Sequence, residues 1–233
     1  GAGDIRVEDW ERLPGVHRGP SQLWAMRERV AQLVADPEPP TGIVITHGTD
    51  TLEETSYLLA RTVSTGVPIV VTGAMRTSTD PDWDGPQNLR DAVSVAAHRE
   101  SAGRGAMVVF AGRILGGLSA VKLDAFGLDA FGSPHAPSLG RVVAGVPSYE
   151  LLPTAERRSL TVPGLTARVA LIPLLLGDDG VLLDAARPLF DGVVIEGFGR
   201  GNVPPGALPA IVRWLEAGKP VVLASRCPFG EVG

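Results

Sequence analysis

Residues 42–55 constrain the fold of this chain more than any other stretch. The apolar run Ile43–Ile45 breaks at Gly48 into hydroxyl and carboxylate residues before a helical pattern begins. This order predicts a buried strand, a tight turn and the start of a helix. In an open parallel sheet, side chains just beyond the carboxyl end of a strand face the crevice where ligands bind. Thr49 and Asp50 are therefore expected at a reaction site.

Strand and helix patterns alternate along the rest of the chain. Strands are expected at 43–45, 67–71, 107–110, 169–174, 192–195 and 221–224, and helices at 21–33, from 51 onward, at 88–100 and at 207–217. Ser21 is expected to cap the first helix, and Thr51 with Glu54 has the pattern of a capping box on the second. Helices of this length between strands favour right-handed βαβ units. The predicted fold class is therefore α/β, with a mostly parallel sheet flanked by helices.

The second predicted helix also has a defined buried face. The residues expected to pack inward are Leu52, Leu58, Leu59 and Val63. Their spacing places them on one side of a helix.

The periodic pattern weakens in the middle of the chain, which indicates two domains. We expect an N-terminal α/β catalytic domain over residues 1–147, a linker over 148–166 and a smaller α/β domain over 167–233. The chain opens on Gly1, which is not an initiator methionine, and its last five residues carry no capping pattern. Both domains are therefore expected to be partial, with the chain truncated at both ends.

Composition excludes several classes of partner. The net charge of -5 provides no general basic field, so a nucleic-acid partner is not expected and a small-molecule substrate fits better. Cys227 is the only cysteine, which excludes an internal disulfide and a cysteine cluster for structural zinc. No apolar stretch approaches the roughly 20 residues that span a bilayer, so no membrane partner is expected. Nothing in the sequence implies a metal or an organic cofactor.

Thr49, Asp50 and Thr51 have two interpretations. Each residue type is a preferred helix cap, so an isolated group of this kind is most simply read as capping. Capping needs one such residue, however, whereas this strand end carries two hydroxyls and a carboxylate. The surplus favours a site, where backbone N–H groups at the helix start can hold an oxyanion or a carboxylate.

Lys122 is the second candidate. The chain has 21 lysine and arginine residues, and only Lys122 and Lys219 are lysines. Lysine can act as a base when desolvated, whereas arginine stays protonated. Lys219 follows a helix stop and is expected on the solvated surface. For Lys122, a surface charge on a loop remains the alternative.

The remaining polar signals are weaker. Four histidines lack the spacing of metal ligands and are expected to have structural roles: His17, His47, His98 and His135. The segment Gly197–Asn202 partly matches a glycine-rich nucleotide loop, but Asn202 stands where the third glycine belongs. A tight turn between strand and helix is the alternative.

Several of these segments together resemble the bacterial-type L-asparaginases, amidohydrolases that convert asparagine to aspartate and ammonia. The segments that carry the resemblance are 46–55, 72–76 with 84–89, Lys122 with 128–134, 197–202 and 225–228. They cover most of the chain in the family's order. The resemblance implies a two-domain asparaginase-like architecture.

The resemblance also implies a mechanism. Thr49, Lys122 and Asp50 match one of the family's two threonine-centred catalytic groups. Lys122, held neutral by burial, is expected to take a proton from the Thr49 hydroxyl or an intervening water, while the Thr49 backbone N–H stabilises the tetrahedral oxyanion. Asp50 is expected to bind the α-ammonium of the substrate.

Further binding residues follow from the same resemblance. Ser21 and Gln22 match the pair that binds the α-carboxylate and α-amino end, and Ala74 is expected to offer its carbonyl to the substrate amide. Asn202 is expected to reach the site of a neighbouring subunit in a homo-oligomer, a dimer or tetramer. The single cysteine and residues 129–134 favour the cytoplasmic kind of asparaginase.

The chain also departs from the family pattern. It has no T-G-G-T-I segment, whose first threonine is the usual nucleophile, and no strands and helix after residue 228. Leu23 and Leu123 replace an acidic and a hydroxyl residue of the family. We therefore expect this chain alone to be inactive.

Two other interpretations stay open. One keeps the fold and changes the substrate to glutamine or to the glutaminyl group of a charged tRNA, although the lack of a basic face argues against the tRNA. The other is a non-catalytic module that binds an amino acid through Asp50 and Ser21.

Overall fold

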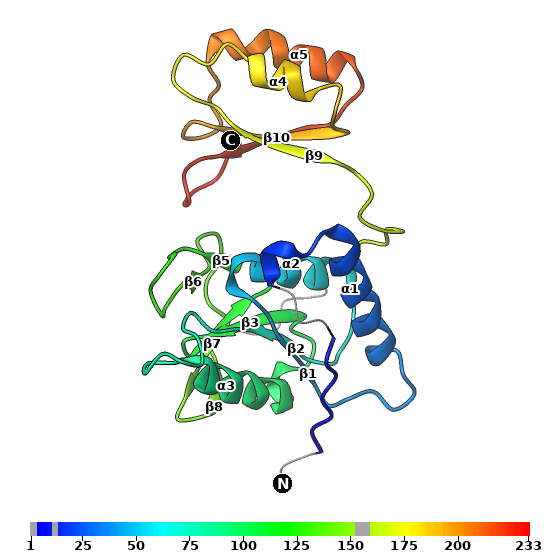
Figure 1. The fold of residues 1–233 in the computed structure, drawn as a ribbon, viewed down its shortest axis with the longest axis vertical. Coiled ribbons are helices and arrows are strands. Elements are labelled where there is room, and N and C mark those ends of the chain that lie inside the picture. Colours follow the sequence, from blue (N-terminus) through cyan, green and yellow to red (C-terminus); the bar gives the residue numbers. More distant parts are fainter. Residues whose placement is uncertain (1–3, 11–13, 152–158) are drawn as a thin grey trace. The chain divides into compact units, whose positions relative to one another are not determined.

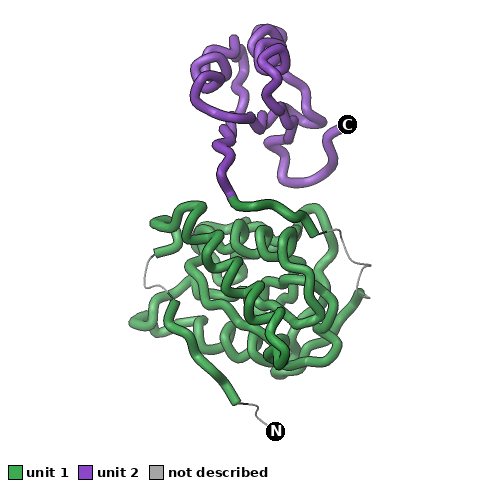
Figure 2. Tube along the Cα trace, turned by 90° about the vertical axis from the view of Figure 1, so that its right-hand side faces the viewer, with its two compact units in different colours: residues 1–164 green, residues 165–233 purple. Residues whose placement is uncertain are grey.

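The computed structural model describes residues 4–10, 14–151 and 159–233 of the chain. These residues form two compact units, unit 1 over residues 1–164 and unit 2 over residues 165–233 (Figure 2). Each unit has its own sheet and its own buried core.

Unit 1 is built on a six-stranded sheet with the order β1-β2-β3-β4-β7-β8. Its strands are β1 Ile43–Thr46, β2 Ile69–Thr72, β3 Ala106–Phe110, β4 Arg113–Gly116, β7 Gly140–Val143 and β8 Val146–Tyr149. β1, β2 and β3 are parallel, with Ile43 opposite Ile69 and Ile69 opposite Ala106, whereas β4, β7 and β8 are antiparallel. A separate antiparallel pair is formed by β5 Val121–Lys122 and β6 Phe131–Gly132.

Three α-helices cover the two faces of this sheet: α1 Pro20–Val34, α2 Leu52–Thr62 and α3 Gly85–Ala97. Short 3-10 turns lie at η1 Gly15–His17, η2 Thr49–Thr51 and η3 Arg99–Ser101. α1 and α2 pack on one face and α3 on the other (Figure 1). The strands are rich in valine and isoleucine because both faces are buried, as is typical of parallel strands.

Unit 2 has a three-stranded parallel sheet with the order β11-β10-β9. Its elements are β9 Val169–Pro173, α4 Val181–Ala186, β10 Gly192–Gly197, η4 Pro205–Ala207, α5 Leu208–Glu216 and β11 Val221–Ser225. The core between the sheet and α4 and α5 is centred on Trp214, which is fully buried and donates its indole N–H to the Leu183 carbonyl at 2.8 Å.

The structure confirms the predicted fold class, a mixed α/β arrangement of two units with mostly parallel strands at the centre. The four inward positions predicted on α2 are also confirmed, since each is less than a tenth exposed. The antiparallel strands β4, β7 and β8 were not predicted from the sequence. They have four residues each and mix polar residues, glycine or proline with apolar ones, so they carry no clear periodic signal.

The predicted side-chain capping of the first two helices does not form. Gly19 is the N-cap of α1, and Gln22 Oε1 reaches back to accept the Gly19 N–H at 3.1 Å. Ser21 lies inside the first turn and donates its hydroxyl to the same Gln22 oxygen at 2.9 Å. Thr51 is the N-cap of α2 but makes no side-chain capping hydrogen bond, so the capping box with Glu54 does not form.

Lys219 is also not the freely solvated residue that was predicted. It is half-buried, and its Nζ donates to the carbonyl oxygens of Arg187 and Phe190, each at 2.6 Å. It therefore ties the segment that follows α4 to the start of β11.

The middle of the chain is described in part. Residues 152–158 of the predicted 148–166 linker lie outside the described residues. On either side, Tyr149 ends β8, and Leu160 donates its N–H to the Arg61 carbonyl at 2.7 Å within unit 1. The domain bounds drawn from the sequence stay a prediction.

None of the helices in the described parts of the chain has both the length and the apolar composition needed to cross a membrane.

Candidate functional site

The site centres on the turn that follows β1. The strand ends at Thr46, and Thr49 and Asp50 lie on η2 just beyond its carboxyl end. Lys122 reaches this turn from β5, with Nζ donating to Thr49 Oγ1 at 2.9 Å and to Asp50 Oδ1 at 2.8 Å. The structure therefore brings together the three side chains that the sequence analysis grouped.

The three groups differ in exposure. The side chain of Lys122 is 17% exposed, whereas that of Asp50 is 64% exposed. Asp50 can therefore meet a solvent-borne ligand while holding Lys122 from one side. Lys122 is mostly buried, as was expected, and its ion pair with Asp50 accompanies its contact with Thr49.

Gly73 allows the turn after β2 to lie against the turn after β1. A Cβ on Gly73 would stand 2.3 Å from the His47 carbonyl oxygen and 3.4 Å from Thr49 Cγ2. A backbone oxygen at that distance leaves no space for any side chain. Ala74, the next residue, is thus placed beside the Thr49 turn.

Asp84 holds the segment that carries Ala74. Its two carboxylate oxygens accept the backbone N–H groups of Met75 and Arg76, each at 3.0 Å. Asn88 joins the same network, because its amide donates to Asp84 Oδ2 and to the Gly73 carbonyl, both at 3.0 Å. Sequence reasoning assigned no role to Asp84 or Asn88, although an acidic residue before a helical Gly-Pro is a signal for backbone binding.

His47 supports the same turn from inside. Its Nδ1 donates to the Gly48 carbonyl at 2.8 Å, and the Thr55 hydroxyl lies 3.0 Å from Nε2. Burial lowers the pKa of His47 below its ordinary value, which keeps the ring neutral. The neutral ring then accepts the Thr55 hydroxyl at Nε2, so His47 has the structural role expected of it.

Ser21 and Gln22 lie at the start of α1. Their side chains bond to each other and to the Gly19 backbone, and no hydrogen bond among the described residues joins them to Thr49, Asp50 or Lys122. The turn η1, just before α1, packs against η2. The contact brings the chain entering α1 to the Thr49 turn.

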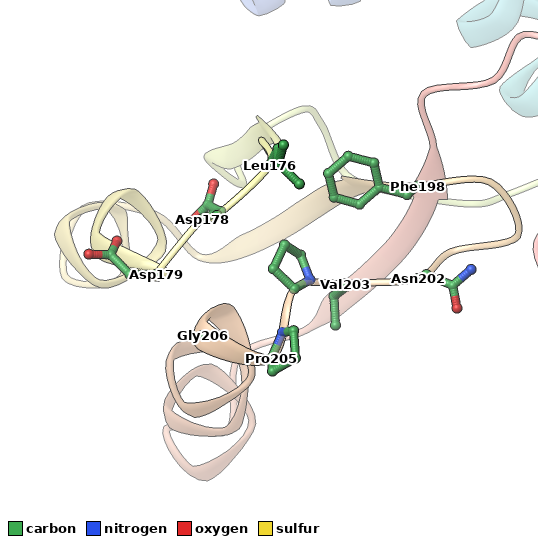
Figure 3. A pocket seen from close by; sticks show the side chains of 10 residues that line it. Leu176, Asp178, Asp179, Phe198, Asn202, Val203, Pro205 and Gly206 are labelled. Atoms are coloured by element: carbon green, nitrogen blue, oxygen red, sulfur yellow. The ribbon is translucent and has the colours of Figure 1, made fainter.

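Asn202 lies in unit 2, in the loop after β10. Phe198 and Asn202 exchange backbone hydrogen bonds of 2.8 Å, which confirms a tight turn at this glycine-rich segment. Asn202 borders an open cavity at the carboxyl ends of β9 and β10, with Leu176, Phe198 and Pro205 (Figure 3). Among the described residues its side-chain amide has no hydrogen-bond partner, so it is available to a ligand or another chain.

Two protein-family models match the chain, one over each unit. The family model described as "Asparaginase, N-terminal" matches residues 1–153, and that described as "Glutaminase/Asparaginase C-terminal domain" matches residues 168–233. The chain is 37% identical to the "Probable L-asparaginase" of Deinococcus radiodurans over 94% of this chain and 67% of the relative. It is 33% identical to the "Glutaminase-asparaginase" of Pseudomonas aeruginosa over 89% of this chain and 59% of the relative.

A solved structure agrees with these relatives. The crystal structure of a "Probable Cytoplasmic L-asparaginase" from Campylobacter jejuni superposes with a TM-score of 0.88 at 30% identity. The match covers 96% of this chain and 73% of that protein. This chain therefore spans about three fifths to three quarters of the length of these three proteins.

Proposed function

Since the chain belongs to the asparaginase family, we propose that the protein hydrolyses the side-chain amide of L-asparagine to L-aspartate and ammonia. The observation that carries the proposal is the contact of Lys122 Nζ with both Thr49 Oγ1 and Asp50 Oδ1. A hydroxyl, an amine and a carboxylate in mutual contact at a strand end form a proton-transfer group.

In the proposed reaction, Lys122 accepts a proton and later gives it up, and Thr49 lies beside the substrate amide. As an oxygen nucleophile attacks the amide carbon, its proton passes by way of Thr49 Oγ1 or a water molecule to Lys122 Nζ, which accepts it as an uncharged amine. The negative charge that forms on the carbonyl oxygen is stabilised by backbone N–H groups of the η2 turn. The proton then moves to the leaving nitrogen, and ammonia departs as the C–N bond breaks. When the nucleophile is water the carboxylic acid forms at once, and when it is a hydroxyl group the resulting ester is hydrolysed by a water molecule, which restores the hydroxyl.

The proposed substrate contacts lie around this group. Asp50 is exposed enough to accept the α-ammonium of an amino acid while it keeps its contact with Lys122. Ala74 offers its carbonyl to the side-chain amide from a segment that Asp84 holds in place. We assign Ser21 and Gln22 to the α-carboxylate end of the substrate, since η1 packs against the Thr49 turn and the chain then enters the helix that carries these two residues.

The test is ammonia release from L-asparagine by this 233-residue chain and by the product of its complete open reading frame. Thr49→Ala is expected to lower kcat by roughly a thousandfold or more in whichever form is active, because it removes a group used in the transition state. Thr41→Ala is the matched control, since Thr41 precedes β1 on the same segment and has no part in the proposed site. A Thr49→Ala enzyme that keeps the parental rate contradicts the proposal.

Glutamine hydrolysis is the second candidate. The Pseudomonas aeruginosa relative is named a glutaminase-asparaginase, and the unit 2 family model covers both activities. Ammonia release from L-glutamine, measured beside that from L-asparagine at equal concentration, separates the two. Ligand binding with no turnover of either amide supports an amino-acid-binding module instead.

We further propose that the protein is a cytoplasmic homo-oligomer, a dimer or tetramer, in which Asn202 contributes to a neighbouring subunit's site. The exposed, unpartnered amide of Asn202 supports the contact, and the name of the Campylobacter jejuni protein supports the location. Light scattering measures the assembly, and cell fractionation the location. Asn202→Ala is expected to weaken substrate binding.

A further inference from the structure

The backbone of Lys122 is held in an unusual way. Lys122 lies on β5, which among the described residues pairs with β6 in a two-stranded sheet separate from the six-stranded one. The main sheet therefore does not fix the position of this strand. A lysine whose Nζ must meet two partners needs its Cα in a defined place, because the side chain has four rotatable bonds.

Glu53 provides that support. Its Oε2 accepts the backbone N–H of Lys122 at 2.6 Å, a contact between residues 69 positions apart in the sequence. Glu53 lies in the first turn of α2, three residues beyond Asp50. A charged acceptor makes a shorter and stronger hydrogen bond than a neutral one.

Both ends of Lys122 are thus held by one short segment. Thr49 and Asp50 bind its Nζ, and Glu53 binds its backbone N–H. Because this segment is the η2 turn continuing into α2, the distance between the two anchor points is set by helix geometry. Ser56 adds a second tie from α2, since its hydroxyl lies 3.3 Å from the Gly117 carbonyl on the segment that leads to β5.

We propose that Glu53 is a positioning residue that fixes β5 so that Lys122 Nζ reaches Thr49 and Asp50. This role rests on the proposed function for its catalytic meaning. The contact itself does not touch the substrate, and Glu53 acts only through Lys122.

The two-lysine composition gives a test that needs no turnover. Acetylation with an amine-reactive reagent, quantified by peptide mass spectrometry, reports Lys122 relative to Lys219, which is bound to two carbonyls in unit 2. In Glu53→Ala the Lys122 to Lys219 ratio is expected to rise by roughly threefold or more, as local opening frees Nζ. In Glu53→Gln the same ratio should rise less, because the amide oxygen of the glutamine still accepts the Lys122 backbone N–H.

Glu54→Gln is the matched control. It makes the same change one residue along α2, and among the described residues no hydrogen bond from the Glu54 carboxylate reaches β5. Its ratio and its kcat should match those of the parent. A ratio in Glu53→Ala equal to that of the parent overturns the proposal. If Glu53→Ala does not fold, a parental ratio in Glu53→Gln overturns it.

Kinetics test the functional consequence. Misplacing Lys122 is expected to lower kcat of Glu53→Ala about tenfold to a hundredfold with KM within about twofold, and Glu53→Gln should recover part of the loss. A parental kcat in Glu53→Ala contradicts the positioning role. Equal losses of kcat in Glu53→Ala, Glu53→Gln and Glu54→Gln contradict it as well. Absence of amide hydrolysis both in this chain and in the product of its complete open reading frame contradicts the proposed function, while the acetylation ratio still decides whether Glu53 holds Lys122.

Discussion

The two units have similar parallel strands, but the turns at the carboxyl ends of these strands differ between them. In unit 1 the turns after β1 and β2 meet at Gly73 without space for a side chain, and Lys122 joins Thr49 to Asp50. In unit 2 the loops after β9 and β10 border an open, mostly apolar cavity. There, the Asp178 carboxylate binds its own loop, since it accepts the Gly180 N–H at 2.8 Å.

The difference shows what a strand end needs in order to become a reaction site. The carboxyl edge of a parallel sheet supplies the place in both units. Among the described residues, unit 1 adds the side chain of Lys122 from the separate strand β5, and its Nζ lies against the Thr49 hydroxyl and the Asp50 carboxylate. The lysines make the contrast plain, since Lys122 meets a hydroxyl and a carboxylate whereas Lys219 meets two carbonyls.

The largest expected effect separates these lysines. Lys122→Met should lower kcat for asparagine by roughly a thousandfold or more, because it removes the proton acceptor. Lys219→Met should leave kcat near the parental value and destabilise unit 2 by about 1–3 kcal/mol through two lost hydrogen bonds. Steady-state kinetics and urea unfolding measure the two effects. Similar kinetic losses in both variants would remove the contrast between the units.

A second comparison concerns glycines in the two strand-end turns. Gly73→Ala places a Cβ against the His47 backbone oxygen, so the turns must separate, at a cost of about 1–3 kcal/mol in unfolding free energy. Activity should fall as well, since Thr49 lies beside this contact. Gly199 of unit 2 has φ +51° with open space around it, so Gly199→Ala should cost only about 1 kcal/mol. Thermal unfolding and ammonia release of both variants show whether Gly73→Ala loses more stability and activity than Gly199→Ala. A Gly73→Ala variant with parental stability and activity would contradict the close packing of the two turns.

The third comparison concerns carboxylates that bind backbone N–H groups. Asp84→Asn replaces one acceptor oxygen by a donor facing Met75 or Arg76, so the Ala74 segment should loosen and kcat/KM should fall about tenfold. Asp191 of unit 2 accepts the Arg168 N–H at 2.8 Å in the same manner. Asp191→Asn should leave kcat/KM unchanged. Equal kinetics in the two variants would show that the Ala74 segment needs no support from Asp84.

Sequence reasoning succeeded where the signal is local. The β-branched run before Gly48 predicts β1, and its polar exit predicts the position of Thr49 and Asp50. The rarity of lysine led to Lys122, although no local pattern shows that it meets Thr49. The contacts of Lys122 with Glu53, Thr49 and Asp50 all join residues about 70 positions apart, and nothing in periodicity encodes such pairs.

The failures have the same physical origin. Ser21 was predicted as a cap because of its residue type, but Gly19 is the N-cap of α1 and the Gln22 side chain folds back to accept the Gly19 N–H. The role of Glu53 was missed because a glutamate at a helix start is ordinary in sequence. What distinguishes Glu53 is that its carboxylate accepts the backbone N–H of Lys122 on β5, a contact that depends on the fold. Tertiary contacts therefore decide between roles that local propensity leaves equal.

The smallest expected effect is a pH dependence confined to unit 1. All four histidines belong to this unit, and burial lowers the pKa of His47. The unfolded chain then binds a proton more readily than the folded chain, so the stability from His47 is complete above roughly pH 6.5 and is lost as the pH falls toward the folded-state pKa. The midpoint of thermal unfolding should therefore decline less steeply between pH 7 and pH 5 in His47→Gln than in the parent. His135→Gln is the control, because His135 is exposed and should keep the parental slope. Equal slopes in the parent and His47→Gln would mean that His47 titrates as it does in the unfolded chain, and that the inner side of the Thr49 turn is wetter than its hydrogen bonds to Gly48 and Thr55 indicate.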